Sequence, residues 1–359
     1  MKRRSLIKKA FTLGTSASAF YSLPLLAKPS DNPMLKMVHP ELRDIANQLL
    51  NGNIQIPSIS QNVLKQSRAG LLAMRKQPLA GTSVTNRRVP GMKGQPDVEI
   101  FIINADSDKK RPAIIHTHGG GFVMGSAQDS IQTLQAMSQN LDCVIVSVEY
   151  RLAPETTYID SIEDNYAALK WVYKHAESLG VDPERIAVMG ESAGGAHAAL
   201  LAITARDRGE IPIAFQCLIY PMLDDRTGSS RSVPPHIGKI LWTAESNRFG
   251  WSSFLGVDAG SNNVPAQAVP ARITNLSGLP PTFIGVGSLD LFSDECIEYA
   301  QRLNASAVST ELLVIPGVFH GFDTLHVFGT QTRISQKFTD TKLNALRRGL
   351  GIKQPEACA

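Results

Sequence analysis

The clearest indication of the fold is the segment IAVMGESAGG, at residues 186–195. Its first four residues are apolar and predict a buried strand, and residues 197–206 behind it predict a helix. Ser192 lies between them at the centre of a G-x-S-x-G motif. On a sharp strand-to-helix turn of this kind, a serine side chain is exposed at the end of the strand and can act as a nucleophile. The alternative is an ordinary tight turn, which the flanking strand and helix disfavour.

Short apolar segments alternate with amphipathic ones on both sides of this motif. They predict strands at residues 98–102, 113–116, 144–148, 186–189, 215–219, 282–286 and 312–315. A helix is predicted before the fourth of these strands, with Ile162, Tyr166, Leu169 and Val172 on one face. Continuous apolar strands separated by helices are typical of an α/β fold with a mostly parallel central sheet and helices on both faces.

Two segments lack this alternation and predict a helical cap over one edge of the sheet. Residues 28–80 show apolar residues at helical spacing and no clear strand, and an insertion at about residues 225–270 is interrupted by prolines and glycines. The catalytic domain, with this insertion, is expected to span residues 81–359. The candidate substrate-pocket residues are Phe122, Trp242, Phe249 and Trp251. The alternative is that the aromatic residues of the insertion, Phe254 among them, form a small core of their own.

A glycine run follows the strand predicted at residues 113–116. It has the sequence HGGG at residues 118–121, and its backbone N–H groups could face the negative charge that develops during acyl transfer. A phosphate-binding loop is the alternative, but neither G-x-x-x-x-G-K-[ST] nor G-x-G-x-x-G is present here. We therefore predict an oxyanion hole formed by Gly119, Gly120, Gly121 and Ala193, and which two of the three glycines donate stays open.

A nucleophilic serine needs a base, and the base needs an acid that orients it. His320 and Asp290 each follow a predicted strand directly, so both are expected at the same edge of the sheet as Ser192. The chain order serine, aspartate, histidine is that of α/β-hydrolases. Among the other candidates, Asp294 and Glu295 are interpreted as first-turn charges of the next helix. His116 and His118 are interpreted as structural supports of the glycine run.

With these residues assembled, the chain resembles the hormone-sensitive-lipase-like esterases, the H-G-G-G type of bacterial esterase in the α/β-hydrolase superfamily. The resemblance runs from about residue 98 to residue 322. It includes YRLAPE at residues 150–155 and HGF at residues 320–322 besides the motifs above. Two positions depart from the common pattern, because Glu191 stands where many members have Asp and residues 290–292 read DLF where many have Asp-Pro-Leu.

The resemblance implies a serine carboxylesterase that hydrolyses short- to medium-chain esters through an acyl-enzyme. A small-molecule ester is then the expected partner, and the mechanism requires no metal and no organic cofactor. One alternative is a deacetylase or lactonase acting on carbohydrate, xenobiotic or antibiotic esters. Another is a non-catalytic binding protein with the hydrolase fold. Either a monomer or a homodimer is compatible with the sequence.

The charge of the chain is concentrated at its amino terminus. Of 36 basic and 32 acidic residues among 359, five basic residues and no acid lie in residues 1–27, so the remainder is close to neutral. No basic stripe with interleaved aromatics follows, which argues against a nucleic-acid partner. With 43% hydrophobic and 19% charged residues, the composition also excludes a disordered chain.

The amino-terminal segment predicts export. A basic stretch at residues 2–9 precedes an apolar run at residues 10–27, and RRSLIK at residues 3–8 resembles the twin-arginine motif. We expect residues 1–27 to be a signal peptide of a bacterial periplasmic or secreted protein without stable membrane insertion after export. A cytosolic amphipathic helix and a membrane anchor are the alternatives. The four cysteines show no metal-ligand spacing and are interpreted as small buried residues.

Overall fold

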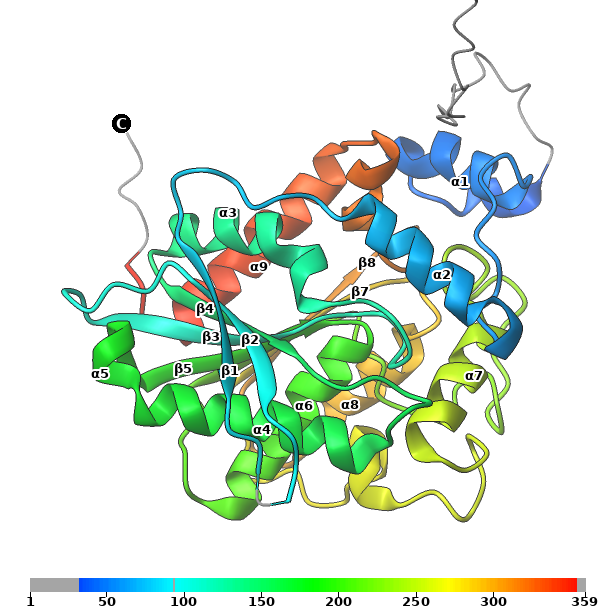
Figure 1. Cartoon of the computed structure of the whole chain (residues 1–359). Helices are drawn as coiled ribbons and strands as arrows, with labels where there is room; N and C mark the ends of the chain where they lie inside the picture. The colour runs from blue at the N-terminus through cyan, green and yellow to red at the C-terminus, as the bar shows by residue number, and fades with distance from the viewer. Residues whose placement is uncertain (1–31, 93, 354–359) are drawn as a thin grey trace, which may run out of the picture. The chain divides into compact units, whose positions relative to one another are not determined.

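The computed structural model describes residues 32–92 and 94–353, and a single eight-stranded sheet runs through them (Figure 1). In spatial order the strands are β1 (Val84–Val89), β2 (Val98–Ile103), β4 (Val144–Glu149), β3 (Arg111–Thr117), β5 (Val181–Glu191), β6 (Phe215–Ile219), β7 (Thr282–Gly287) and β8 (Thr310–Ile315). Strand β2 is antiparallel to both of its neighbours, and the other pairs are parallel. The predicted mostly parallel sheet is confirmed.

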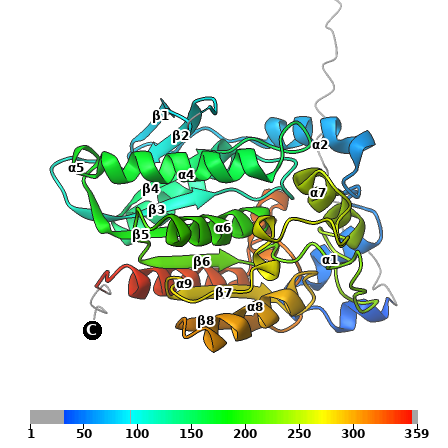
Figure 2. The same ribbon diagram turned by 90° about the horizontal axis from the view of Figure 1, so that it is seen from below.

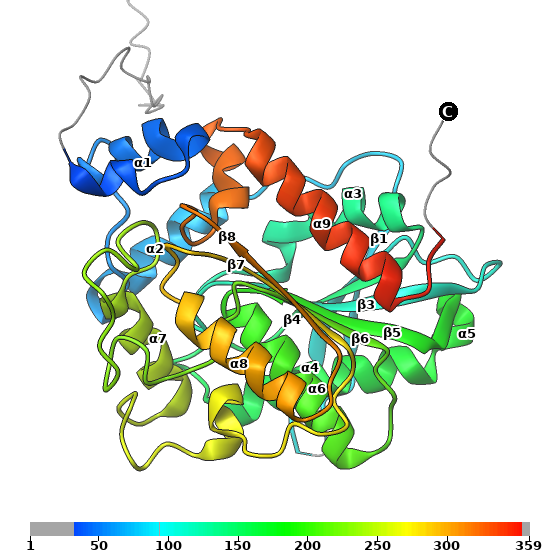
Figure 3. The ribbon, with the colours of Figure 1, turned by 180° about the vertical axis from the view of Figure 1, so that it is seen from behind.

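Helices cover the sheet on both faces, which confirms the predicted layers. On one face lie α3 (Ile131–Leu141) and α9 (Arg333–Gly349) (Figures 1 and 3). On the other lie α4 (Tyr158–Lys174), α6 (Ala193–Arg208) and α8 (Ser293–Ala305), with the short α5 (Ala176–Leu179) after α4. Strands β3, β6 and β7 are buried at every residue, as expected for strands that apolar helices cover from both sides.

Strand β1 is an element that the sequence analysis did not predict. Its sequence, VTNRRV, is mostly polar, and Val89 is its only buried residue. It lies at the edge of the sheet and pairs with β2 alone. An edge strand with most of its side chains in solvent lacks the apolar run by which the inner strands are recognised.

The two segments predicted as a cap lie at one end of the sheet (Figures 1 and 2). The first comprises η1 (Pro33–Lys36), η2 (Pro40–Leu42), α1 (Arg43–Leu50) and α2 (Gln61–Met74), and the second comprises α7 (Ala244–Leu255), η4 (Ala266–Ala268) and η5 (Pro270–Arg272). The Ile59 N–H donates a hydrogen bond of 2.9 Å to Ser246 Oγ, and the Ser58 and Thr243 hydroxyls are 3.2 Å apart. The structure therefore brings the two segments into contact. The remaining short helices are η3 (Ala127–Ser130) and η6 (Phe322–Phe328).

The predicted signal peptide at residues 1–27 lies outside the described residues, as does Cys358. Cys143, Cys217 and Cys296 are buried and unpaired. Among the helices of the described residues, none has both the length and the apolar composition that a bilayer-spanning segment requires. Within the same residues, no group of three His, Cys, Asp or Glu side chains is arranged to hold a metal ion.

Candidate active site

Ser192 lies on a strained turn between β5 and α6. Its backbone has φ 58° and ψ −122°, a conformation that non-glycine residues rarely adopt and that is concentrated at functional sites. Positions 190 and 194 require glycine, because neighbouring backbone atoms lie too close for a side chain. A Cβ atom at Gly190 would lie 2.3 Å from the Gly194 carbonyl oxygen, and one at Gly194 would lie 2.0 Å from the Thr117 carbonyl oxygen. The G-x-S-x-G pattern is therefore a packing requirement of this turn.

The structure brings His320 and Asp290 to Ser192 from two other strand ends. His320 Nε2 is 3.0 Å from Ser192 Oγ, and His320 Nδ1 is 2.9 Å from Asp290 Oδ2. Since a carboxylate only accepts, Nδ1 donates to Asp290, which leaves Nε2 to accept from the serine hydroxyl. Asp290 is fully buried, and its other oxygen accepts from the Phe292 N–H at 3.0 Å. This is the geometry of a nucleophile, a base and an orienting acid.

Aromatic rings surround the His320 imidazole, and the sequence analysis did not anticipate them. The rings of Tyr220 and Phe292 meet it edge-on, with centroids 4.8 and 5.1 Å away. The Tyr220 hydroxyl donates to Asp323 Oδ1 at 2.8 Å, and the buried Lys342 ammonium lies 3.8 Å from the other oxygen of Asp323. Tyr220 also has a positive φ of 34°, so it is a second strained residue beside the site.

The glycine run packs directly against the nucleophile turn. A Cβ atom at Gly119 would lie 3.0 Å from the Glu191 carbonyl oxygen and 3.5 Å from Ser192 Cβ. Gly120 and Gly121 have φ values of +132° and +61°, which favour glycine. Within the described part of the chain, the N–H groups of residues 119–121 make no hydrogen bond. Ala193 is the first residue of α6, where helix N–H groups have no partner within the helix.

The predicted pocket aromatics separate into two groups. Phe122, Trp251 and Phe254 are buried together, and the Phe122 ring stacks on Phe254 at 4.0 Å and contacts Trp251 at 4.8 Å. This is the small core considered above as the alternative, whereas Phe249 is only partly buried. Trp242 lies at the site itself: a Cβ atom at Gly121 would be 2.1 Å from its ring.

Two buried histidines support this region without hydrogen-bonding to the reacting groups. Burial lowers the pKa of His118 to about 4 and the pKa of His197 to about 3, so both are neutral near pH 7. His118 stacks on the Tyr150 ring at 4.2 Å, and the Tyr150 hydroxyl donates to the His118 carbonyl oxygen at 2.6 Å. His197 has no hydrogen-bond partner at either ring nitrogen and packs against Phe122.

Glu295 lies in the first turn of α8, as its interpretation requires, but it also makes contacts that the sequence analysis did not anticipate. It is buried, and its carboxyl binds the loop that follows β6. The N–H groups of Leu223 and Asp224 donate to Oε1 at 2.6 and 3.3 Å, and Thr227 Oγ1 contacts Oε2. Burial raises the pKa of Glu295 well above its usual range, and the carboxyl links α8 to the loop after β6, a role that the sequence analysis did not assign to it.

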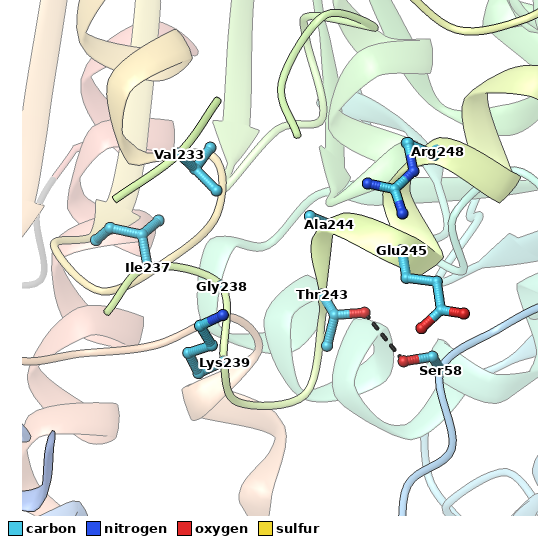
Figure 4. Close-up of a pocket in the computed structure, with 9 residues that line it drawn as sticks. All are labelled: Ser58, Val233, Ile237, Gly238, Lys239, Thr243, Ala244, Glu245 and Arg248. Carbon is cyan, nitrogen blue, oxygen red and sulfur yellow. Dashed lines mark hydrogen bonds between the residues drawn. The ribbon is translucent and has the colours of Figure 1, made fainter. Parts of the chain in front are cut away.

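A cavity of about 280 Å³ lies where the two cap segments meet (Figure 4). Its lining includes Ser58 and Thr243, which face each other, and the exposed charged side chains of Lys239, Glu245 and Arg248. Gly238, also in the lining, donates its N–H to the Leu289 carbonyl oxygen at 3.3 Å. The cavity therefore borders the loop that carries Asp290.

Comparisons with known proteins agree with this fold. Residues 114–324 match the family model described as alpha/beta hydrolase fold. The chain is 31% identical to the carboxylesterase NlhH of Mycobacterium tuberculosis over 333 residues, which cover 91% of this chain and 98% of that protein. It is 38% identical over 212 residues to the esterase LipI of the same organism, covering 59% of this chain and 65% of LipI.

A solved structure is similar over nearly its whole length. The structure titled bacterial heroin esterase has a TM-score of 0.79 and 36% identity, and the match covers 88% of this chain and 99% of that one. The chain therefore belongs to the α/β-hydrolase family, in its hormone-sensitive-lipase-like esterase branch.

Proposed function

We propose that this protein is a serine carboxylesterase in which Ser192 is the nucleophile, His320 the base and Asp290 the orienting acid. The observation that carries the proposal is the pair of hydrogen-bond distances at His320, 3.0 Å to Ser192 Oγ and 2.9 Å to Asp290 Oδ2. These three residues come from loops after three different strands, so no local sequence constraint brings them together. Membership of the esterase branch supports the same activity.

The reaction follows from the positions of these groups. Ser192 Oγ attacks the ester carbonyl carbon while His320 Nε2 accepts its proton. The negative charge on the carbonyl oxygen is stabilised by N–H groups of residues 119–121 and Ala193, and the collapse of this intermediate releases the alcohol, which takes the proton from His320. Water, deprotonated by His320, then attacks the acyl-enzyme and frees the acid and Ser192.

The proposed substrates are small-molecule esters with short to medium acyl chains. Ser192 and His320 are only 7% and 8% exposed, so the reacting groups are largely buried, which favours small substrates. The Trp242 ring lies beside them, with its centroid 6.3 Å from that of His320 and its edge against Gly121. Phe122 and Trp251 belong to the buried aromatic core, and Phe249 is partly buried against the core.

The test is hydrolysis of p-nitrophenyl esters of increasing acyl length by the wild type and by Ser192→Ala. We expect rates that fall with acyl length, and a loss of about 10⁵- to 10⁶-fold in kcat for the variant. Ser178→Ala, at an exposed serine, is the control and should keep wild-type rates. Equal rates for wild type and Ser192→Ala would place the nucleophile elsewhere.

A substrate panel separates the remaining alternatives. Acetylated sugars and lactones are compared with simple alkyl esters, and higher kcat/KM on either would favour a deacetylase or lactonase. Covalent labelling by an organophosphate reports whether Ser192 is nucleophilic at all. Absence of labelling would support a non-catalytic binding protein.

We also propose that the protein is exported to the periplasm or secreted, on the basis of the RRSLIK sequence at residues 3–8. Replacing Arg3 and Arg4 by lysine should retain the protein in the cytoplasm of a bacterial host, as measured by cell fractionation. Unchanged export would contradict a twin-arginine route. The proposed assembly state is a monomer or homodimer, which sedimentation at two protein concentrations distinguishes.

A further inference from the structure

Three polar side chains form a row across the strands that carry the site, buried at Ser147 and His116 and partly exposed at Glu191. His116 on β3 lies between Ser147 on β4, its direct partner in the sheet, and Glu191 at the end of β5. His116 Nδ1 is 2.8 Å from Ser147 Oγ, and His116 Nε2 is 2.9 Å from Glu191 Oε2. Because the carboxylate only accepts, Nε2 donates to Glu191, while Nδ1 is hydrogen-bonded to the Ser147 hydroxyl.

The row has the same order of groups as a hydrolytic triad, but it is not a second reaction centre. Ser147 and His116 are both fully buried inside the sheet, so no substrate carbonyl reaches the Ser147 hydroxyl. The serine hydroxyl here is hydrogen-bonded to one side of the imidazole and thereby orients the ring toward Glu191.

The row joins the two segments on which the proposed reaction depends. Glu191 immediately precedes Ser192, and His116 is two residues before the HGGG run. The same two segments touch through the backbone, since Thr117 Oγ1 donates to the Gly194 carbonyl oxygen at 2.7 Å and Gly119 packs on the Glu191 carbonyl. The hydrogen bond between His116 and Glu191 is a further link between the nucleophile turn and the segment that leads into the glycine run, and it is made by two side chains.

The link is a strong hydrogen bond because the carboxyl is charged. Burial by itself would raise the pKa of Glu191, but the attraction and hydrogen bond of His116 outweigh burial and hold this pKa below its usual value, and Lys342 adds to the effect. A hydrogen bond to an ionised acceptor is roughly twice as strong as one between neutral groups. The length of the Glu191 side chain also matters for this hydrogen bond, because an aspartate at this position is one methylene shorter and its carboxyl would not extend as far toward His116.

We propose that Glu191 and His116 are positioning residues, which hold the nucleophile turn and the oxyanion loop at the separation needed in the transition state. This inference rests on the proposed function, since it concerns the same Ser192 and the same glycine run. It assigns a role to the length of the Glu191 side chain, which places the carboxyl within 2.9 Å of His116 Nε2.

The experiment compares two variants. Glu191→Gln keeps the length of the side chain and loses its charge, and Glu191→Asp keeps the charge and shortens the side chain by one methylene. On p-nitrophenyl butyrate we expect Glu191→Asp to lose about tenfold or more in kcat with KM nearly unchanged, because small displacements of reacting groups cost this much. We expect Glu191→Gln to lose less kcat than Glu191→Asp, because an amide oxygen still reaches His116 and accepts from it, although this hydrogen bond is weaker than the one to the charged carboxylate. Affinity for a trifluoromethyl ketone inhibitor should fall in parallel with kcat.

The same two variants are then made with His116→Phe, which fills the space of the imidazole without a hydrogen bond. In that background Asp and Gln at position 191 should give the same kcat, because reach no longer matters. The control is Glu163, whose side chain is 22% exposed like that of Glu191 and pairs with Arg208 on the outer surface at 2.5 Å. Glu163→Asp and Glu163→Gln should both keep wild-type kcat.

Rates are expressed per active site titrated with an organophosphate. Equal kcat for Glu191→Asp and Glu191→Gln, with only Tm lowered, would overturn the inference and leave a structural role for Glu191. A difference in kcat between the two variants that persists in the His116→Phe background would overturn it as well. Failure of the proposed function has a separate signature, which is an active Ser192→Ala or an unlabelled wild type. The folding of both Glu191 variants is compared with that of the wild type by circular dichroism before the rates are measured.

Discussion

At the level of single residues, the tautomer and orientation of the His320 imidazole depend on the groups that hydrogen-bond to its two ring nitrogens. Asp290 accepts from Nδ1 and is itself held by the Phe292 N–H. Asp290→Asn keeps the shape but presents an amide N–H or a neutral oxygen, which favours the wrong tautomer of His320. We expect a loss of about 10⁴-fold in kcat with a nearly unchanged Tm, measured on p-nitrophenyl esters. Asp294→Asn, at an exposed position four residues further, is the control. An active Asp290→Asn would mean that another acid orients His320.

His197 carries a prediction about pH. Its folded-state pKa of about 3 lies below the ordinary value of 6.5, because burial excludes the charged form. The unfolded chain therefore binds a proton below pH 6.5 that the folded chain does not, and stability falls as the pH decreases from 6.5 toward 3. His197→Phe should reduce this fall by up to about 1.4 kcal/mol per pH unit, measured by urea unfolding at pH 4, 5, 6 and 7. Parallel stability curves for the two proteins would show that His197 takes up a proton in the folded state.

At the scale of elements, Glu295 connects α8 to the loop after β6. That loop also touches the nucleophile turn, since the Met222 N–H donates to the Ser192 carbonyl oxygen at 3.0 Å. Because burial raises the folded-state pKa of Glu295, the folded chain keeps a proton that the unfolded chain loses above about pH 4.5, and stability falls as the pH rises from 4.5 toward the folded-state pKa.

A glutamine at position 295 has the donors and acceptors of the protonated acid. Its oxygen can accept from Leu223 and Asp224, and its amide can donate to Thr227. We expect Glu295→Gln to fold, to keep its activity, and to lose less stability than the wild type between pH 5 and 8 in urea unfolding. Glu298→Gln, at the next turn of α8 on the surface, should leave the pH dependence unchanged. A Glu295→Gln variant that follows the wild-type pH dependence would mean that Glu295 is ionised in the fold.

At the scale of the whole molecule, the segment from Pro33 to Met74 reaches several distant parts of the site. The His39 N–H donates to the Gly317 carbonyl oxygen, three residues before His320. On α2, Arg68 donates to the carbonyl oxygens of Val123 and Ala153 at 2.7 and 2.9 Å and pairs with Glu155. Val123 follows the glycine run, so this arginine fastens the cap segment to the oxyanion loop.

Replacing Arg68 by alanine leaves the Val123 and Ala153 carbonyls without their donor. Because hydrogen bonds from charged donors contribute about 1.5–3 kcal/mol, we expect a Tm lower by several degrees. We also expect a lower kcat/KM, as α2 loosens from the loop, in steady-state assays. Lys65→Ala, on the same helix and exposed, serves as the control. Wild-type kcat/KM in Arg68→Ala would mean that the cap segment does not constrain the oxyanion loop.

The sequence by itself determined the fold class, the inner strands and the positions of Ser192, Asp290 and His320. These features depend on signals within a few residues: an apolar run, a glycine that a turn requires, or a polar residue directly after a strand. Because parallel strands place their carboxyl ends at one edge, the local motifs were sufficient to predict that these side chains meet.

The side chains that complete the site become known only from the folded structure. Strand β1, the burial of Glu295, the core around Phe122 and Trp251, and the row from Ser147 to Glu191 all depend on contacts between residues far apart in the chain. Such contacts leave no periodic pattern in the sequence, and the residue type alone does not show whether a carboxyl will be buried or exposed. Their environment is set by the neighbours that packing brings to them, and these neighbours exist only once the chain is folded.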